Sequence, residues 1–121
     1  MKTLKLTILL AVASIFMLSS CSKEPGFEGK NTIKGSVTLN GAPVKNAIVY
    51  LAFDTKEVTS TFNASTATDA NGNYSFSAVS KGDYYMEAEY TNPMQITFKS
   101  GGAKLTIGSK KDDVVVDLIL H

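Results

Sequence analysis

The sequence predicts an all-β fold, an antiparallel Greek-key β-sandwich of about seven or eight short strands. The main observation is the stretch from 68 to 90, TDANGNYSFSAVSKGDYYMEAEY, in which apolar and polar residues alternate between two turns. Turn residues also recur at short intervals through the rest of the chain, and no segment after about residue 21 has a helical period. Closely spaced short strands of this kind are typical of sandwiches and small barrels.

The hairpin over residues 74–90 is the clearest element. In its first strand Tyr74, Phe76 and Ala78 share one face, opposite Ser75 and Ser77. In its second strand one face carries Tyr84, Met86, Ala88 and Tyr90, and the other carries Tyr85, Glu87 and Glu89. One apolar face on each strand indicates that the hairpin is half-buried.

Further strands are predicted in chain order over residues 32–39, 47–53, 61–68, 94–99, 104–107 and 114–120. Asn40-Gly41 marks a tight turn, because both residues tolerate a positive φ. Pro43 lacks the N–H that a sheet ladder needs, so we expect it outside a central strand. Residues 47–53, AIVYLAF, are apolar on both faces, which indicates a strand that is covered on both sides.

Residues 1–20 are predicted to be a cleaved signal peptide. Lys2 and Lys5 precede an apolar run of roughly 13 residues, shorter than the about 20 that a membrane-spanning helix needs. The run ends in Leu18-Ser19-Ser20-Cys21, which resembles the lipobox of bacterial lipoproteins. Lipidation would explain the single cysteine, which cannot form an internal disulfide. We therefore expect lipid on Cys21 to anchor the chain in the cell envelope, on the surface or periplasmic face of the bacterial outer membrane.

The mature chain is expected to consist of a lipidated tether over residues 21–31 and one domain over residues 32–121. The tether is polar and without periodicity, and Lys23-Glu24 leaves open whether it is a plain linker or a surface-export signal. Without Lys2 and Lys5, ten of the twelve lysines stand against eleven acidic residues. No basic patch is present, so we expect no nucleic-acid partner.

Several short motifs keep a fixed order along the domain. Gly35-x-Val37, Gly41-x-Pro43 and Ala47-x-Val49-x-Leu51 are followed by Thr68-Asp69-x-x-Gly72-x-Tyr74-x-Phe76 and Val79-x-x-Gly82-x-Tyr84. Together they resemble the carboxypeptidase regulatory-like domains, which share the transthyretin-like (prealbumin) sandwich. The resemblance covers about residues 33–90 and implies an accessory, stalk or adhesion module without catalysis of its own.

No catalytic residue, cofactor or metal site is predicted. The chain has no arginine and its only histidine is His121, so the hydrolase and iron-dioxygenase sites of related sandwiches lack their residues. Asp69, Asn71 and Asn73 have the opening spacing of a calcium loop, but glycine and glutamate are missing farther along. A turn explains these three residues.

Tyr50 and Tyr85 are the candidates for ligand contact. Each points opposite the main apolar face of its strand, where a ring could stack on a glycan. The alternative is that both rings pack under a loop or against the tether. We expect a lipid-anchored, non-enzymatic binding or adhesion module that contacts a protein or a glycan. A structural subunit of a periplasmic or outer-membrane complex is the alternative function.

Overall fold

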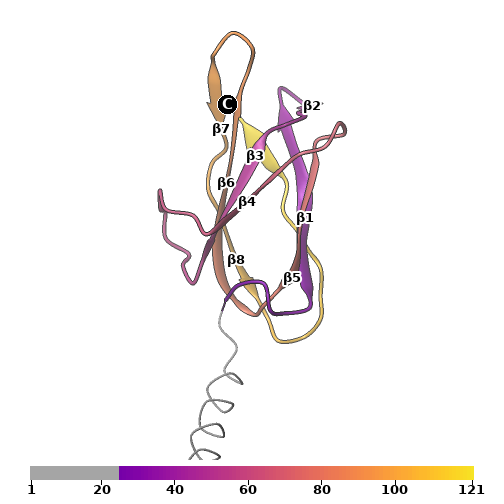
Figure 1. The fold of residues 1–121 in the computed structure, drawn as a ribbon, viewed down its shortest axis with the longest axis vertical. Helices are drawn as coiled ribbons and strands as arrows, with labels where there is room; N and C mark the ends of the chain where they lie inside the picture. Colours follow the sequence, from indigo (N-terminus) through magenta and orange to yellow (C-terminus); the bar gives the residue numbers. More distant parts are fainter. Residues whose placement is uncertain (1–24) are drawn as a thin grey trace, which may run out of the picture.

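The computed structural model describes residues 25–121, which form two β-sheets packed face to face (Figure 1). The strands are β1 (Asn31–Leu39), β2 (Ala42–Pro43), β3 (Ile48–Phe53), β4 (Ala64–Ala67), β5 (Asn73–Val79), β6 (Gly82–Thr91), β7 (Thr97–Lys99), β8 (Ala103–Ile107), β9 (Val114–Val115) and β10 (Leu118–Leu120). The predicted all-β sandwich is confirmed. It has ten strands, because β2 is counted separately and the closing strand divides into β9 and β10. Within residues 25–121, no helix has the length and apolar character to cross a membrane.

The first sheet is built around β1. The antiparallel strand β5 pairs with the first part of β1, with Ile33 opposite Phe76 and Gly35 opposite Tyr74. On the other side of β1 lie β9 and β10, and both run parallel to it. This departs from the all-antiparallel arrangement that the sequence predicted. The cause is that the chain returns to this sheet from the end at which β1 begins (Figure 1).

The second sheet has the order β4-β3-β6, with β8 beside the first part of β6 and β7 beside its last part. All of its pairs are antiparallel. β3 lies between two neighbours, in agreement with its apolar sequence. Pro43 pairs with Thr38 at the end of β1, in the two-residue strand β2, so it avoids the central part of either sheet.

The core lies between the two sheets. Its most deeply buried side chains, each at most 1 % exposed, are Ile33, Val37, Ala47, Val49, Leu51, Val79, Tyr84, Met86 and Ala88. Tyr74 and Phe76 join them, as the alternation in the hairpin predicted. Ala78 does not, although it was placed on the same face. Its φ of 58° turns the strand, so Ala78 is exposed and Val79 enters the core instead.

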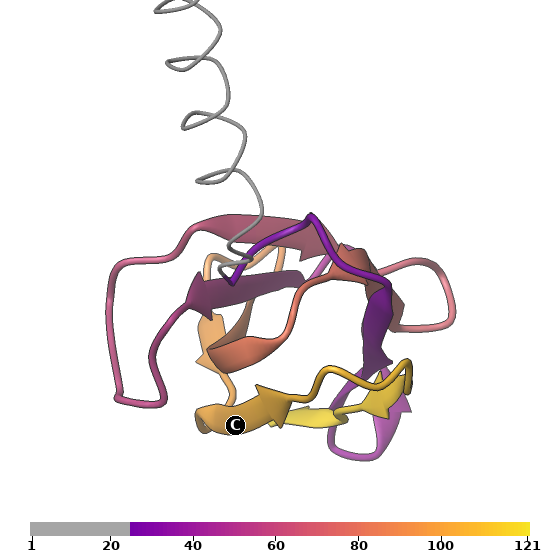
Figure 2. The same ribbon diagram turned by 90° about the horizontal axis from the view of Figure 1, so that it is seen from below.

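The packed structure begins before β1. Residues 25–30, which we call the strap, lie against the end of the sandwich where the β5–β6 turn and the β8–β9 loop also lie, and we call this end the base (Figure 1). Figure 2 shows the strap crossing the base toward β1. The sequence placed these residues in the expected tether, because glycine, proline and charged residues give no sign of their backbone hydrogen bonds with Ala78 of β5 and with Ser80 in the turn after it. Cys21 and the expected signal peptide lie outside the described residues.

Candidate binding groove on the outer face of the second sheet

The outer face of β3 and β6 brings aromatic and charged side chains together. Val49 and Leu51 point into the core, so the intervening Tyr50 points outward. The register places Tyr50 opposite Glu87 and, on the next strand along, Glu89 opposite Lys99. An aromatic ring therefore lies beside a row of two carboxylates and one ammonium group.

The connection over residues 54–63 folds back over this face. The end of this connection is held at Asn63. Its side-chain Oδ1 accepts a hydrogen bond from the Phe53 N–H at 2.7 Å. The Asn63 N–H donates to the carbonyl of Leu51 at 2.9 Å. These bonds place the Phe62 ring with its centroid 5.2 Å from that of Tyr50. Phe62 thus covers part of the sheet.

The result is an open groove of about 680 Å³, which we call the outer groove. Its lining residues are Tyr50, Val58, Thr59, Ser60, Phe62, Glu87, Glu89 and Lys99. The two rings are half-buried and offer apolar surface, whereas the carboxylates accept hydrogen bonds and the ammonium group donates them. Such a combination suits a ligand that has both an apolar face and hydroxyl groups.

The two tyrosines proposed from the sequence have different environments. Tyr50 lines the outer groove, as expected for a contact residue. Tyr85 is only 2 % exposed, because Phe62 stacks on it at 6.4 Å and Gly102 lies against its hydroxyl. Burial raises the pKa of Tyr85, and the nearby Glu87 carboxylate raises it further. The exposure expected for Tyr85 was wrong, and the alternative of packing under a loop describes it.

Phe62 was not among the predicted site residues. It stands in a polar stretch, Thr61-Phe62-Asn63, where it would be the odd apolar residue of an expected strand. An isolated aromatic between polar neighbours at the end of a long loop was the available signal. Strand alternation could not identify it, because residues 61–63 precede β4.

A second hollow, of about 690 Å³, lies where β1, β5, β9 and the end of β4 meet. Its carboxylates hold the backbone. Asp69 Oδ1 accepts from the N–H groups of Asn71 and Asn73, both at 2.9 Å, so this segment is the predicted turn. Asp117 Oδ1 accepts from the Ser36 N–H at 2.9 Å. Among residues 25–121, no group of three or more His, Cys, Asp or Glu is placed to hold a metal ion.

Comparisons with known proteins agree with this fold. The sequence pattern of the carboxypeptidase regulatory-like domain matches residues 32–118. The major pilin subunit BcpA of Bacillus cereus superposes with a TM-score of 0.55 and 16% identity, over 76% of this chain. This chain spans only 30% of that pilin chain. A "putative carbohydrate binding protein" of Pseudomonas aeruginosa superposes with a TM-score of 0.51 and 20% identity, over 77% of this chain and 91% of its own. A comparison with curated proteins gives no significant match.

Proposed function

Because this chain belongs to the carboxypeptidase regulatory-like domain family, we propose that it is a non-enzymatic β-sandwich module that binds a glycan in the outer groove. Family membership alone identifies no ligand. The observation that carries the proposal is the presence of Tyr50, Phe62 and the carboxylates of Glu87 and Glu89 in one open groove. The Pseudomonas aeruginosa protein of similar fold and length, described as carbohydrate binding, supports the same class of ligand.

The chemistry of a sugar ring matches this groove. A pyranose has an apolar C–H face, which stacks on aromatic rings, and an edge of hydroxyl groups. Tyr50 stands directly opposite Glu87, so a sugar stacked on the ring would bring its hydroxyls to that carboxylate. Lys99, opposite Glu89, adds a donor for a hydroxyl or a ring oxygen.

The lipid on Cys21 would hold this module at the cell envelope. The support for this part of the proposal is the Leu18-Ser19-Ser20-Cys21 motif after a short apolar run. Acyl chains at about 0.8 kcal/mol per buried methylene give stable membrane attachment. Cys21→Ala should release the protein from the membrane fraction. Protease treatment of intact cells would distinguish the surface face of the outer membrane from its periplasmic face. Only a domain exposed on the cell surface is digested before the outer membrane is opened.

Glycan binding is tested with a panel of soluble oligosaccharides, followed by calorimetry with any ligand found. Tyr50→Ala should weaken binding about tenfold or more, because it removes the stacking surface. Glu87→Gln should weaken it as well, while Met94→Ala, on the distant β6–β7 hairpin, should leave the affinity unchanged. Absence of binding to every glycan of the panel, or an unchanged affinity of Tyr50→Ala, would contradict the proposal.

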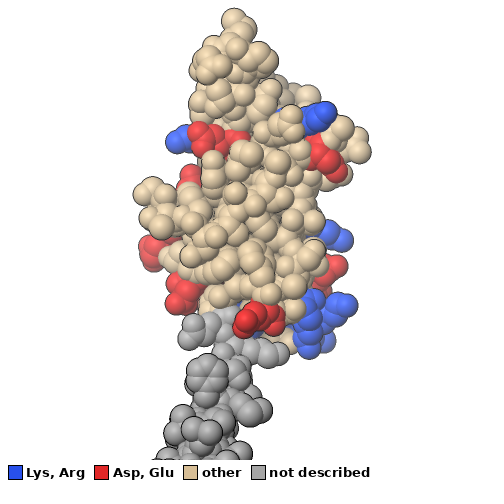
Figure 3. Space-filling view, in the orientation of Figure 1, with Lys and Arg blue, Asp and Glu red and all other residues tan. Residues whose placement is uncertain are grey.

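One observation favours the alternative role in an envelope assembly. The tip of the β6–β7 hairpin exposes Met94 by 78% and Ile96 by 49%, within a stretch from 90 to 98 that has no charged residue. Figure 3 shows this end of the molecule without charged side chains. A stoichiometric partner that copurifies from membranes and is lost in Met94→Asp, with Tyr50→Ala unaffected, would support assembly over glycan binding.

A further inference from the structure

The strap is bonded to the base through its backbone. The Gly26 N–H donates to the Tyr84 hydroxyl at 3.0 Å, and the Ser80 N–H donates to the Gly26 carbonyl at 2.8 Å. The Glu28 N–H donates to Ser80 Oγ at 3.1 Å. Tyr84, Ser80 and Gly26 are buried, so the two bonds of Gly26 are shielded from water, whereas the bond of Glu28 is shielded only in part. The strap is therefore part of the folded domain.

Side chains fix the strap as well. The Phe27 ring meets Phe53 edge-on at 5.3 Å and stacks on Phe76 at 6.1 Å, although it remains 43% exposed. The backbone of Gly29 lies against the carbonyl of Val79 so closely that a side chain at position 29 would overlap it. The strap thus leaves an aromatic ring exposed at the base.

The distance from the lipid to the base is short. Only residues 22–24 separate Cys21 from Pro25, the first described residue. Whatever conformation these residues adopt, four peptide steps span at most about 14 Å. Pro25, where the strap begins at the base, therefore stays within about 14 Å of a lipidated Cys21, a distance comparable with the Debye length of about 8–10 Å at physiological salt.

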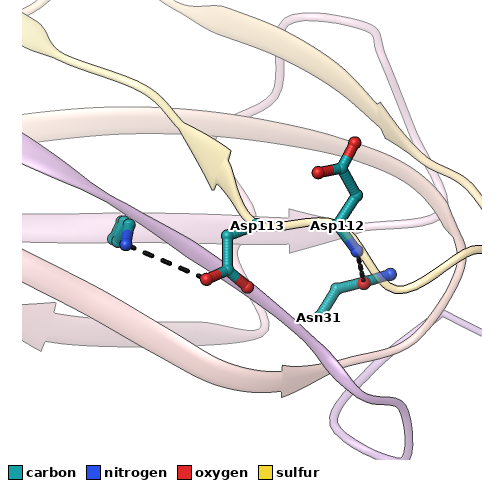
Figure 4. Close-up of polar contacts among 4 residues, drawn as sticks. Asn31, Asp112 and Asp113 are labelled. Carbon is teal, nitrogen blue, oxygen red and sulfur yellow. Dashed lines mark hydrogen bonds and ion pairs between the residues drawn. The ribbon is translucent and has the colours of Figure 1, made fainter.

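One side of the base is rich in lysine. Asn31, which is 2 % exposed, joins the β8–β9 loop to the strap. Its Nδ2 donates to the Gly108 carbonyl at 3.2 Å, and its Oδ1 accepts from the Asp112 N–H at 2.8 Å (Figure 4). This brings together three exposed lysines, Lys30, Lys110 and Lys111, which we call the lysine edge. Figure 3 shows lysines gathered at the lower right of the molecule, with acidic side chains beside them and also at the lower left.

The acidic residues near the base are distributed unevenly. Asp113 is paired with Lys34, with 3.8 Å between Nζ and Oδ2 (Figure 4). Glu28 and Asp112 are the carboxylates beside the lysine edge. Asp54 and Asp83 lie with Lys81 around a neighbouring hollow of the base. The base is thus close to neutral in total, and at the lysine edge three lysines stand against the two carboxylates of Glu28 and Asp112.

We propose that the strap holds the base against the membrane that carries the lipid, and that the lysine edge contacts anionic phospholipid headgroups there. This rests on the lipid anchor of the proposed function. Lysine ammonium groups near an anionic surface attract phosphate groups, and the short tether keeps their effective concentration high. The exposed Phe27 ring enters the headgroup region, and the part of the base that carries Asp54 and Asp83 tilts away. The β6–β7 hairpin then points away from this membrane.

The test uses the mature lipidated chain in vesicles of phosphatidylcholine, with or without phosphatidylglycerol. Ser109→Cys places a reactive thiol at the base, and Met94→Cys places one at the hairpin tip. Because acylation blocks the Cys21 thiol, each variant has one free thiol. A water-soluble thiol reagent should label position 109 about fivefold more slowly in anionic vesicles than in phosphatidylcholine alone. Position 94 should react equally in both.

Two double variants of equal charge distinguish the effect of the lysine edge on labelling from the effect of net charge. Lys110→Gln with Lys111→Gln should abolish the slowing at position 109. The matched control, Lys45→Gln with Lys104→Gln, removes the same charge from exposed positions elsewhere and should keep it. An insertion of about 20 glycine and serine residues between Glu24 and Pro25 should also raise labelling at position 109 several-fold, because the base can then leave the membrane.

The outcomes distinguish this inference from the anchor on which it depends. Equal labelling of position 109 in both vesicles, with the protein still anchored, overturns the inference and leaves the anchor intact. If both double variants lose the slower labelling of position 109 to the same extent, the role of the lysine edge is overturned. Recovery of the chain with an unmodified Cys21 thiol and no vesicle retention overturns the anchor and the inference together.

Discussion

The hydroxyl of Tyr84 lies 3.0 Å from the backbone nitrogen of Gly26, which precedes it by 58 residues. The same hydroxyl donates to the carbonyl of Ser80 at 2.7 Å, and the side chain is fully buried. One core tyrosine therefore joins the strap, the β5–β6 turn and the sandwich interior. A hydrogen bond between elements so distant in sequence makes the strap's position depend on the core.

Tyr84→Phe should loosen the strap without unfolding the domain. The change leaves the Gly26 N–H and the Ser80 carbonyl without their partner, at a cost of about 1–3 kcal/mol in the free energy of unfolding. The ring contact with Phe53, at 5.8 Å, is kept. Urea unfolding measures the loss of stability. The substitution should increase the rate of amide hydrogen exchange more at Gly26 than in β3. Unchanged exchange at Gly26 would show that the strap is held by other contacts.

Gly35→Ala should be among the most damaging single substitutions. The connection from β9 to β10 passes over Gly35, so a Cβ there would overlap the carbonyl oxygen of Val116 and lie 2.6 Å from its carbonyl carbon. Both are backbone atoms and cannot move aside cheaply. We expect a loss of about 3 kcal/mol.

Gly101→Ala is the matched control, since a Cβ at Gly101 would meet nothing within 4 Å. Its effect on thermal unfolding should stay within about 0.5 kcal/mol. Similar midpoints for Gly35→Ala and Gly101→Ala would mean that the β9–β10 connection is not held against β1.

Thr68→Val tests a buried polar contact at the end of β4. The Thr68 hydroxyl accepts from the Ala47 N–H at 2.9 Å and donates to the Val44 carbonyl, and the residue is 3% exposed. Valine has the same shape but cannot replace either bond, so unfolding should become easier by about 2–3 kcal/mol. Thr66→Val, half-buried on the edge strand, should change the urea midpoint much less. A neutral Thr68→Val would contradict this assignment.

How far the sequence predicts this structure depends on how local each feature is. The alternation from Tyr74 to Tyr90 identifies the hairpin, because each strand shows its buried face within a few residues. The parallel pairing of β9 and β10 with β1 joins residues about 80 positions apart, and no local pattern records the direction of approach. The prediction that Ala78 lies on the buried face fails for a similar reason, because its positive φ goes with the bulged pairing of β1 with β5.

The candidate site shows the same limit. Tyr50 could be predicted, because alternation alone places it on the outer face. Tyr85 alternates in the same way, yet it is buried because a loop more than 20 residues earlier returns to cover it. Alternation predicts which face of a sheet a side chain takes, and loop packing decides whether that face meets solvent.

The stability of the domain should fall steeply above about pH 10. Burial raises the pKa of Tyr74 well above its usual value, and the Asp117 carboxylate raises it further. Burial likewise raises the pKa of Tyr84, against a smaller lowering by its hydrogen bond to Gly26, and that of Tyr85. Unfolded tyrosine ionises near pH 10, so above that pH the folded chain binds more protons than the unfolded chain. Raising the pH therefore favours unfolding, and stability contributed by these hydroxyls is fully present only below about pH 9.

Each such tyrosine contributes a slope of up to about 1.4 kcal/mol per pH unit between its unfolded and folded pKa. Tyr74→Phe should lower stability at neutral pH, because the hydroxyl donates to the Val116 carbonyl, but it should make the alkaline slope shallower. Urea unfolding from pH 7 to 11 measures both effects. Parallel stability curves for the wild type and Tyr74→Phe above pH 10 would mean that Tyr74 ionises in the folded state as readily as in the unfolded state.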